Sequence, residues 1–60
     1  MTDDSMQAEL ANRGYELVEV GGRYELRDLF GRPPELMGAA NLTDALIEAL
    51  ELTSDRELGK

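Results

Sequence analysis

The chain has 60 residues, of which thirteen are acidic and six are basic, so its formal net charge is −7 at pH 7. It contains no cysteine, histidine or tryptophan, which excludes disulfide bonds, thiolate or imidazole metal sites, and catalysis by cysteine or histidine. A chain of about 60 residues can bury only one small core. We therefore predict a single acidic domain over residues 1–60, with no enzymatic activity, no metal site and no cofactor.

The sequence also bears on location and on the class of partner. No apolar run approaches the about 20 residues that a membrane span requires, and the N-terminal residues lack the basic and apolar regions of a secretory signal. We expect a cytoplasmic protein that does not associate with membranes. Because a charge of −7 repels nucleic acid phosphates and anionic lipids, we also expect basic partners and no direct nucleic acid binding.

The first helix is predicted over residues 2–13, with Thr2 or Asp3 as its N-cap and Gly14 as the left-handed residue after its end. Its apolar stripe consists of Met6 and Leu10. A stripe this narrow has to be covered by a sheet or a second helix, because a short helix is not stable alone.

Two segments, residues 15–20 and 23–29, alternate apolar and polar side chains on either side of Gly21-Gly22, which is typical of a β-hairpin with a two-residue turn. With the glycines at the turn centre, Glu16 faces Arg27 and Leu17 faces Leu26. The side chains predicted to face the core are Tyr15, Leu17, Tyr24 and Leu26. We expect Leu29 and Phe30, at the end of the hairpin, to close the edge of this core.

Residues 35–39 follow Pro33-Pro34 and are ambiguous. We favour a third, edge strand, because Gly38 weakens a helix and a hairpin gains stability from a neighbouring strand. The alternative is a turn of helix that begins at Pro34.

The last helix is predicted from Leu42 to about Leu52 or Asp55, with Asn41 as its N-cap and Asp44 three residues later, as in a capping box. Its core-facing residues, at helical spacing, are Leu42, Ala45, Leu46, Ala49, Leu50 and Thr53. The expected fold is a two-layer α+β domain, αββα or αβββα, with both helices on one face of a small antiparallel sheet.

The candidate site is a row of carboxylates on this last helix, made by Asp44, Glu48, Glu51 and Asp55. Their spacings of four, three and four residues place them within a sector of about 60°, away from the apolar face. No lysine or arginine lies among them, and each like-charge neighbour costs about 0.2–0.5 kcal/mol. The row is either a solvated surface or, together with Asp3, Asp4 and Glu9 of the first helix, a surface for a basic groove.

Ile47 lies on the shoulder of this row. It is either an exposed anchor for a partner or a residue covered by the first helix.

In size, in expected fold, in its lack of catalytic residues and in the row Asp44, Glu48, Glu51 and Asp55, the chain resembles the small acidic anti-CRISPR proteins encoded by phages, in particular the inhibitors of type I effector complexes. The resemblance covers the whole chain in size and charge and involves no specific motif. It implies a DNA mimic that blocks target-DNA binding by occupying a basic effector subunit.

Two other functions are compatible with the sequence. One is a homodimeric accessory domain that pairs through the edge strand and the region of Leu36, Met37 and Ile47, and the other is an antitoxin-like partner of a basic toxin. We expect a monomer rather than a homodimer.

Overall fold

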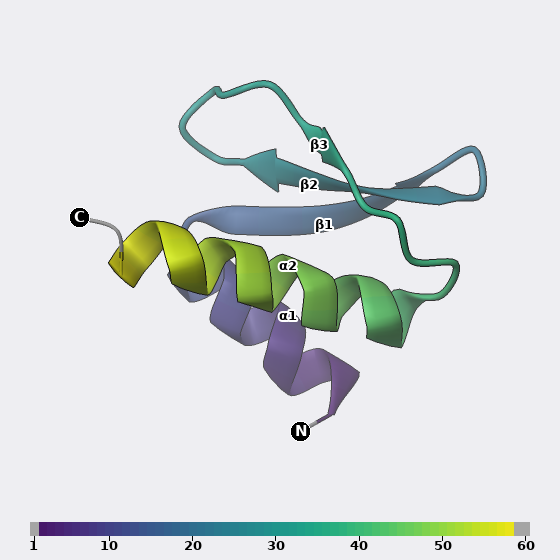
Figure 1. Cartoon of the computed structure of the whole chain (residues 1–60), viewed down its shortest axis with the longest axis horizontal. Helices are drawn as coiled ribbons and strands as arrows, with labels where there is room; N and C mark the ends of the chain where they lie inside the picture. The colour runs from purple at the N-terminus through teal and green to yellow at the C-terminus, as the bar shows by residue number, and fades with distance from the viewer. Residues whose placement is uncertain (1, 59–60) are drawn as a thin grey trace.

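The computed structural model describes residues 2–58. Its elements are α1 (Asp3–Asn12), β1 (Tyr15–Val20), β2 (Arg23–Asp28), β3 (Glu35–Leu36) and α2 (Leu42–Leu58). The strands form an antiparallel sheet in the order β1-β2-β3, and both helices lie on one face of it (Figure 1). The predicted α+β fold is thus confirmed, in its αβββα form. Residues 1 and 59–60, which the domain prediction includes, lie outside the described part of the chain.

The first helix is capped as the sequence predicts. The Thr2 side chain accepts a hydrogen bond from the backbone N–H of Ser5 at 3.2 Å, and Gly14 has a φ of 88°, a left-handed conformation that glycine adopts without strain. The predicted range of 2–13 therefore includes the residues that flank the helix. α1 and α2 run in the same direction, because Asp3 contacts Thr43 near the start of α2 whereas the C-cap of α1, residue 13, contacts its later turns.

The hairpin has the predicted register. Leu17 pairs with Leu26 and Glu16 with Arg27, around a turn in which both glycines have positive φ. β3 contains only two residues of the predicted segment 35–39, but the next residue continues the ladder, since the backbone N–H of Met37 donates to the carbonyl of Tyr24 at 2.8 Å.

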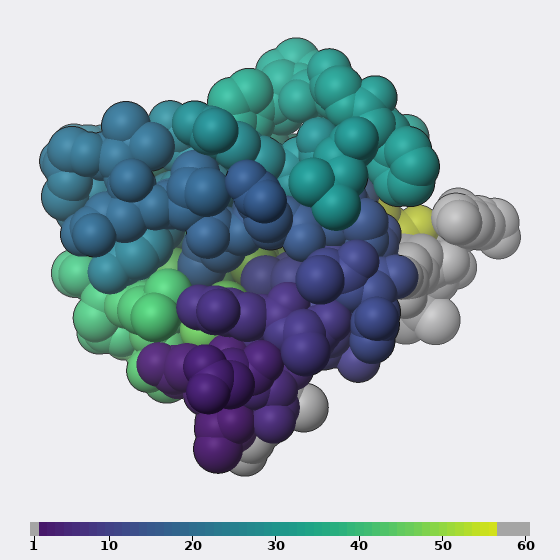
Figure 2. All heavy atoms as spheres, turned by 180° about the vertical axis from the view of Figure 1, so that it is seen from behind, coloured from purple at the N-terminus to yellow at the C-terminus, as the bar shows by residue number. Residues whose placement is uncertain are grey.

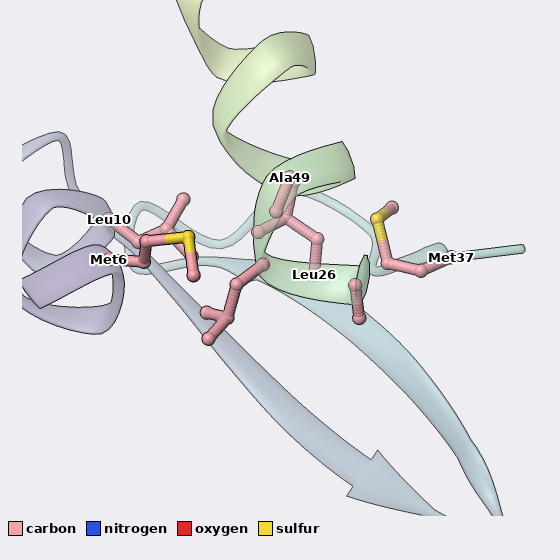
Figure 3. Close-up of a cluster of buried hydrophobic side chains, with 7 residues drawn as sticks. Met6, Leu10, Leu26, Met37 and Ala49 are labelled. Atoms are coloured by element: carbon pink, nitrogen blue, oxygen red, sulfur yellow. The ribbon is translucent and has the colours of Figure 1, made fainter. Parts of the chain in front are cut away.

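The core lies between the sheet and the two helices (Figure 3). Its buried hydrophobic residues are Met6, Leu10, Leu26, Met37, Ala45, Leu46 and Ala49. Tyr15, Leu17 and Tyr24 are half-buried beside this cluster, as expected for the helix-facing side of the hairpin. Met37 reaches the cluster from the segment after β3, so the short third strand contributes mainly by delivering this side chain.

The prediction for Leu29 and Phe30 is wrong, because their exposed fractions are 60% and 82%. The chain turns away from the core directly after β2, where the Asp28 carboxylate accepts the backbone N–H of Phe30 at 2.6 Å. The Phe30 ring lies over Gly14, and a Cβ built on that glycine would be 2.7 Å from the ring. The core is instead flanked at this end by Tyr15, whose ring centroid is 6.0 Å from the Arg56 guanidinium.

The second helix begins at Leu42 as predicted but continues past the two C-terminal ends considered, Leu52 and Asp55, to residue 58. Two contacts that are remote in sequence hold its last turns. Thr53 accepts a hydrogen bond from Arg13 at 2.9 Å, and Arg56 forms an ion pair with Glu35 of β3. Neither contact follows from the periodicity of the helix, which explains why its end was predicted too early.

Candidate functional site

The row of carboxylates lies on the side of α2 that faces away from the core. The residues of α2 that are fully buried against the sheet and α1 are Ala45, Leu46, Ala49 and Thr53. At about 100° per residue the row is centred roughly opposite to them. Asp44, Glu51 and Asp55 are exposed, whereas Glu48 is half-buried.

Asp44 is part of the helix cap. The Asn41 side-chain oxygen accepts the backbone N–H of Asp44 at 2.9 Å, and the Asn41 amide donates to the Asp44 carboxylate at 3.0 Å. Its negative charge therefore lies at the positive end of the α2 dipole, where it is stabilised. A partner can still reach the carboxylate, because the residue is exposed.

Glu48 is engaged within the fold. Its carboxylate accepts the backbone N–H of Gly38 at 3.2 and 3.3 Å, which fastens the segment after β3 to α2. This hydrogen bond spans ten residues of sequence, and no local pattern indicates it. Glu48 thus contributes negative charge to the row but has less freedom to reorient toward a partner.

Glu51 and Asp55 form the least compensated part of the row, because neither carboxylate makes a hydrogen bond or an ion pair with any other described side chain. Together with Arg13, Leu50 and Ser54 they line an open depression of about 430 Å³. This depression lies over the later turns of α2 and adjoins the end of α1.

Arg13 is a cation at this depression that no pattern in the sequence indicates. Its guanidinium donates to the Leu50 carbonyl at 3.0 Å and to the Thr53 hydroxyl at 2.9 Å, and it forms an ion pair with Glu9 at 3.0 Å. Glu9, one of the candidate residues of the first helix, is therefore neutralised within the fold. The contacts hold Arg13 against α2, so the outer edge of the depression remains acidic.

The other two candidate residues of α1 lie at the N-terminal end of the helix pair. The Asp3 carboxylate accepts the Thr43 hydroxyl at distances of 2.9 and 3.1 Å, and Asp4 is exposed. Because the helices are parallel, Asp3 lies beside the first turn of α2, where Asp44 also lies. The structure thus places Asp3 beside the first turn of α2 and leaves Glu9 paired at the other end of α1.

Ile47 is 44% exposed, so the rest of the fold leaves it accessible to a partner. It is an apolar side chain on the shoulder of the acidic row, as one of the two sequence interpretations requires. It does not form a common surface with Leu36 and Met37. Met37 is buried, and Leu36, which pairs with Glu25, faces the side of the sheet opposite to the helices.

Charge is distributed unequally between the two layers. Of the residues described, α1 and α2 contain eight of the thirteen acidic residues of the chain and a single basic residue, Arg56. The pKa of Arg56 is raised by its side-chain hydrogen bonds with Tyr15 and then Glu35, on the sheet side of α2. By contrast, the outer face of the sheet is balanced, with Glu16, Arg23, Glu25 and Arg27 on adjacent strands.

The spacing of the carboxylates suits a row of cations better than a single ion. Among the side chains that the structure describes, no three acidic groups come close enough together to hold a metal ion. The described helices include none with the length and apolar character needed to cross a membrane. No protein family, curated protein or solved structure was found to match the chain.

Proposed function

We propose that this protein is a non-enzymatic inhibitor that binds a basic nucleic-acid-binding protein through an acidic face of α2. The face comprises Asp44, Glu48, Glu51 and Asp55, flanked by Ile47 and by Asp3 and Asp4 of α1. One observation carries the proposal: the exposed carboxylates of this face remain without a cationic partner among the described side chains, while the outer face of the sheet balances its charges.

The physical argument concerns competition for cations. Grooves that bind nucleic acid are lined by lysine and arginine and gain affinity from neutralising phosphates. The carboxylates of α2 extend over about 16 Å at a rise of 1.5 Å per residue, so they can meet several of these cations at once. A chain with a net charge of −7 is also attracted to such a groove from a distance.

The resemblance to anti-CRISPR proteins suggests which groove to test. A type I effector complex presents a basic surface to target DNA, and occupation of that surface would block recognition. The assay measures displacement of a labelled target duplex from a purified type I effector complex. We expect the native protein to compete with the duplex, and its inhibition to weaken steeply as salt concentration rises.

A charge-reversed variant identifies the face. Glu51→Lys with Asp55→Lys alters the two carboxylates that the fold does not use, so the variant is expected to fold and to lose competition. Glu16→Lys with Glu25→Lys makes the same change of net charge on the outer face of the sheet. This control is expected to keep most of its ability to displace the duplex. Equal inhibition by the native protein and the α2 variant would contradict the proposal.

A further inference from the structure

The edge of the sheet formed by β1 has unused hydrogen-bonding groups. β1 is an outer strand (Figure 1). The backbone groups of its even-numbered residues make the hydrogen bonds to β2, as shown by the bond from the Leu29 N–H to the Gly14 carbonyl on the same ladder. The backbone N–H and C=O groups of Tyr15, Leu17 and Glu19 therefore point away from the sheet. No hydrogen bond within the described part of the chain uses them.

A groove gives access to this edge. It has a volume of about 290 Å³ and lies between α1 and β1, which are neighbours on the side of the molecule seen in Figure 2. Leu10 and residues 15–18 line it, and the adjoining flank of α1 provides Gln7 and Ala11. The helix thus contributes uncharged residues where the strand leaves its backbone open.

We propose that β1 pairs in antiparallel fashion with β1 of a second copy of this chain, which joins the two sheets into one across a two-fold axis. The axis passes beside Leu17, so that Leu17 lies opposite Leu17 of the second copy and Tyr15 lies opposite Glu19. This register uses the outward N–H and C=O groups of Tyr15, Leu17 and Glu19 on both chains.

The charges of the edge favour a second copy as the occupant. In this register Glu19 faces Tyr15 and Glu16 faces Val18, so no carboxylate lies directly opposite another. The acidic row is on the solvent side of α2, outside the interface, which reduces repulsion between two chains of charge −7. Glu16 is the one carboxylate among the residues that line the groove, and the flank of α1 adds none, so the groove offers a basic peptide little charge to bind.

The pairing differs from the monomer expected from the sequence and is independent of the proposed function, since it uses another face. Sedimentation equilibrium from micromolar to millimolar concentration should show the mass rising from 6.6 kDa to twice that value. Added salt should strengthen the dimer, because it screens the repulsion between like-charged chains. Binding of α2 to a basic groove should respond to salt in the opposite direction. A 6.6 kDa species at millimolar concentration in high salt would overturn the pairing.

Amide hydrogen exchange tests the register in the native protein. The amides of Tyr15, Leu17 and Glu19 should exchange rapidly at low protein concentration and become protected as the concentration rises. Those of Glu16 and Val18 face β2 and should be protected throughout. Exchange at Leu17 that does not depend on concentration would rule out pairing at this edge.

A synthetic variant can block hydrogen bonding at the outer edge of β1 while leaving the bonds between β1 and β2 intact. Methylation of the backbone nitrogen of Leu17 deletes an outward donor and places a methyl group in the path of the second strand, so the dimer should be lost. The matched control is methylation of the backbone nitrogen of Gly22, at the exposed hairpin turn, which should leave the dimer intact. Circular dichroism checks that both variants fold, and a folded Leu17 variant that still dimerises would contradict the proposal.

Discussion

At the scale of single residues, Arg13 is the side chain that ties the two parallel helices together. Its guanidinium joins the end of α1 to the Leu50 carbonyl and to the buried hydroxyl of Thr53, which in turn donates to the Ala49 carbonyl at 2.9 Å. The bond to Ala49 lies within the helix, so the hydroxyl's donor is satisfied by α2 itself, and Arg13 in addition satisfies its acceptor. The arginine therefore uses the buried hydroxyl as an anchor point on α2.

We predict that Arg13→Ala lowers the free energy of unfolding by about 1–3 kcal/mol, because it removes hydrogen bonds to a charged donor in a partly buried site. Urea denaturation measures the change. Arg23→Ala is the matched control, since Arg23 is exposed on the strand after the turn, and it should cost less than about 0.5 kcal/mol. Equal losses in the two variants would show that Arg13 does not join the helices.

At the scale of elements, local patterns predict what depends on neighbours in sequence. Two glycines flanked by alternating residues predicted the hairpin and its register, and Asn41 with Asp44 predicted the start of α2. The errors concern contacts that are remote in sequence. Nothing near Glu48 indicates that it binds Gly38, so its role in the acidic row was predicted without its role in the fold.

Phe30 is a second residue whose environment the local sequence does not predict. An apolar residue after a strand suggests burial, but the turn stabilised by Asp28 directs it outward, over Gly14. The acidic row itself could be predicted, because helical spacing fixes the direction of its members. The partial neutralisation of its surroundings by Arg13 could not, because it depends on how α1 packs against α2.

The junction between α1 and β1 provides a prediction at this scale. Gly14→Ala should destabilise the protein for two reasons, since the residue has a φ of 88° and its new Cβ would meet the Phe30 ring at 2.7 Å. Gly22→Ala has a similar positive φ but no atom within 4 Å, so it should show the backbone cost alone, about 1 kcal/mol.

Thermal denaturation of the two variants in the native and Phe30→Ala backgrounds separates these costs. Gly14→Ala should be the more damaging in the native background, and the costs should become similar once the ring is removed. If the cost of Gly14→Ala is the same in both backgrounds, the aromatic ring does not restrict this position.

At the scale of the whole molecule, the unequal distribution of charge makes stability depend on salt. The helices carry most of the acidic residues, whereas favourable ion pairs such as Arg13 with Glu9 and Arg56 with Glu35 are few among the described residues. Repulsion among carboxylates therefore outweighs attraction between charges of opposite sign. Because salt screens both, its net effect on this chain is to remove more repulsion than attraction.

We predict that the melting temperature rises with sodium chloride, by about 4–8 °C if screening contributes about 1 kcal/mol. Measurement at low micromolar protein concentration keeps self-association out of the comparison.

Glu51→Gln with Asp55→Asn removes charge from the uncompensated end of the row. This variant should therefore melt at a higher temperature than the native protein in low salt, and its melting temperature should respond less to added salt. Its matched control, Glu16→Gln with Glu25→Gln, removes carboxylates that face or adjoin Arg27 and should melt no higher than the native protein in low salt. A melting temperature that falls with salt would mean that attraction, rather than repulsion, dominates the electrostatics of the fold.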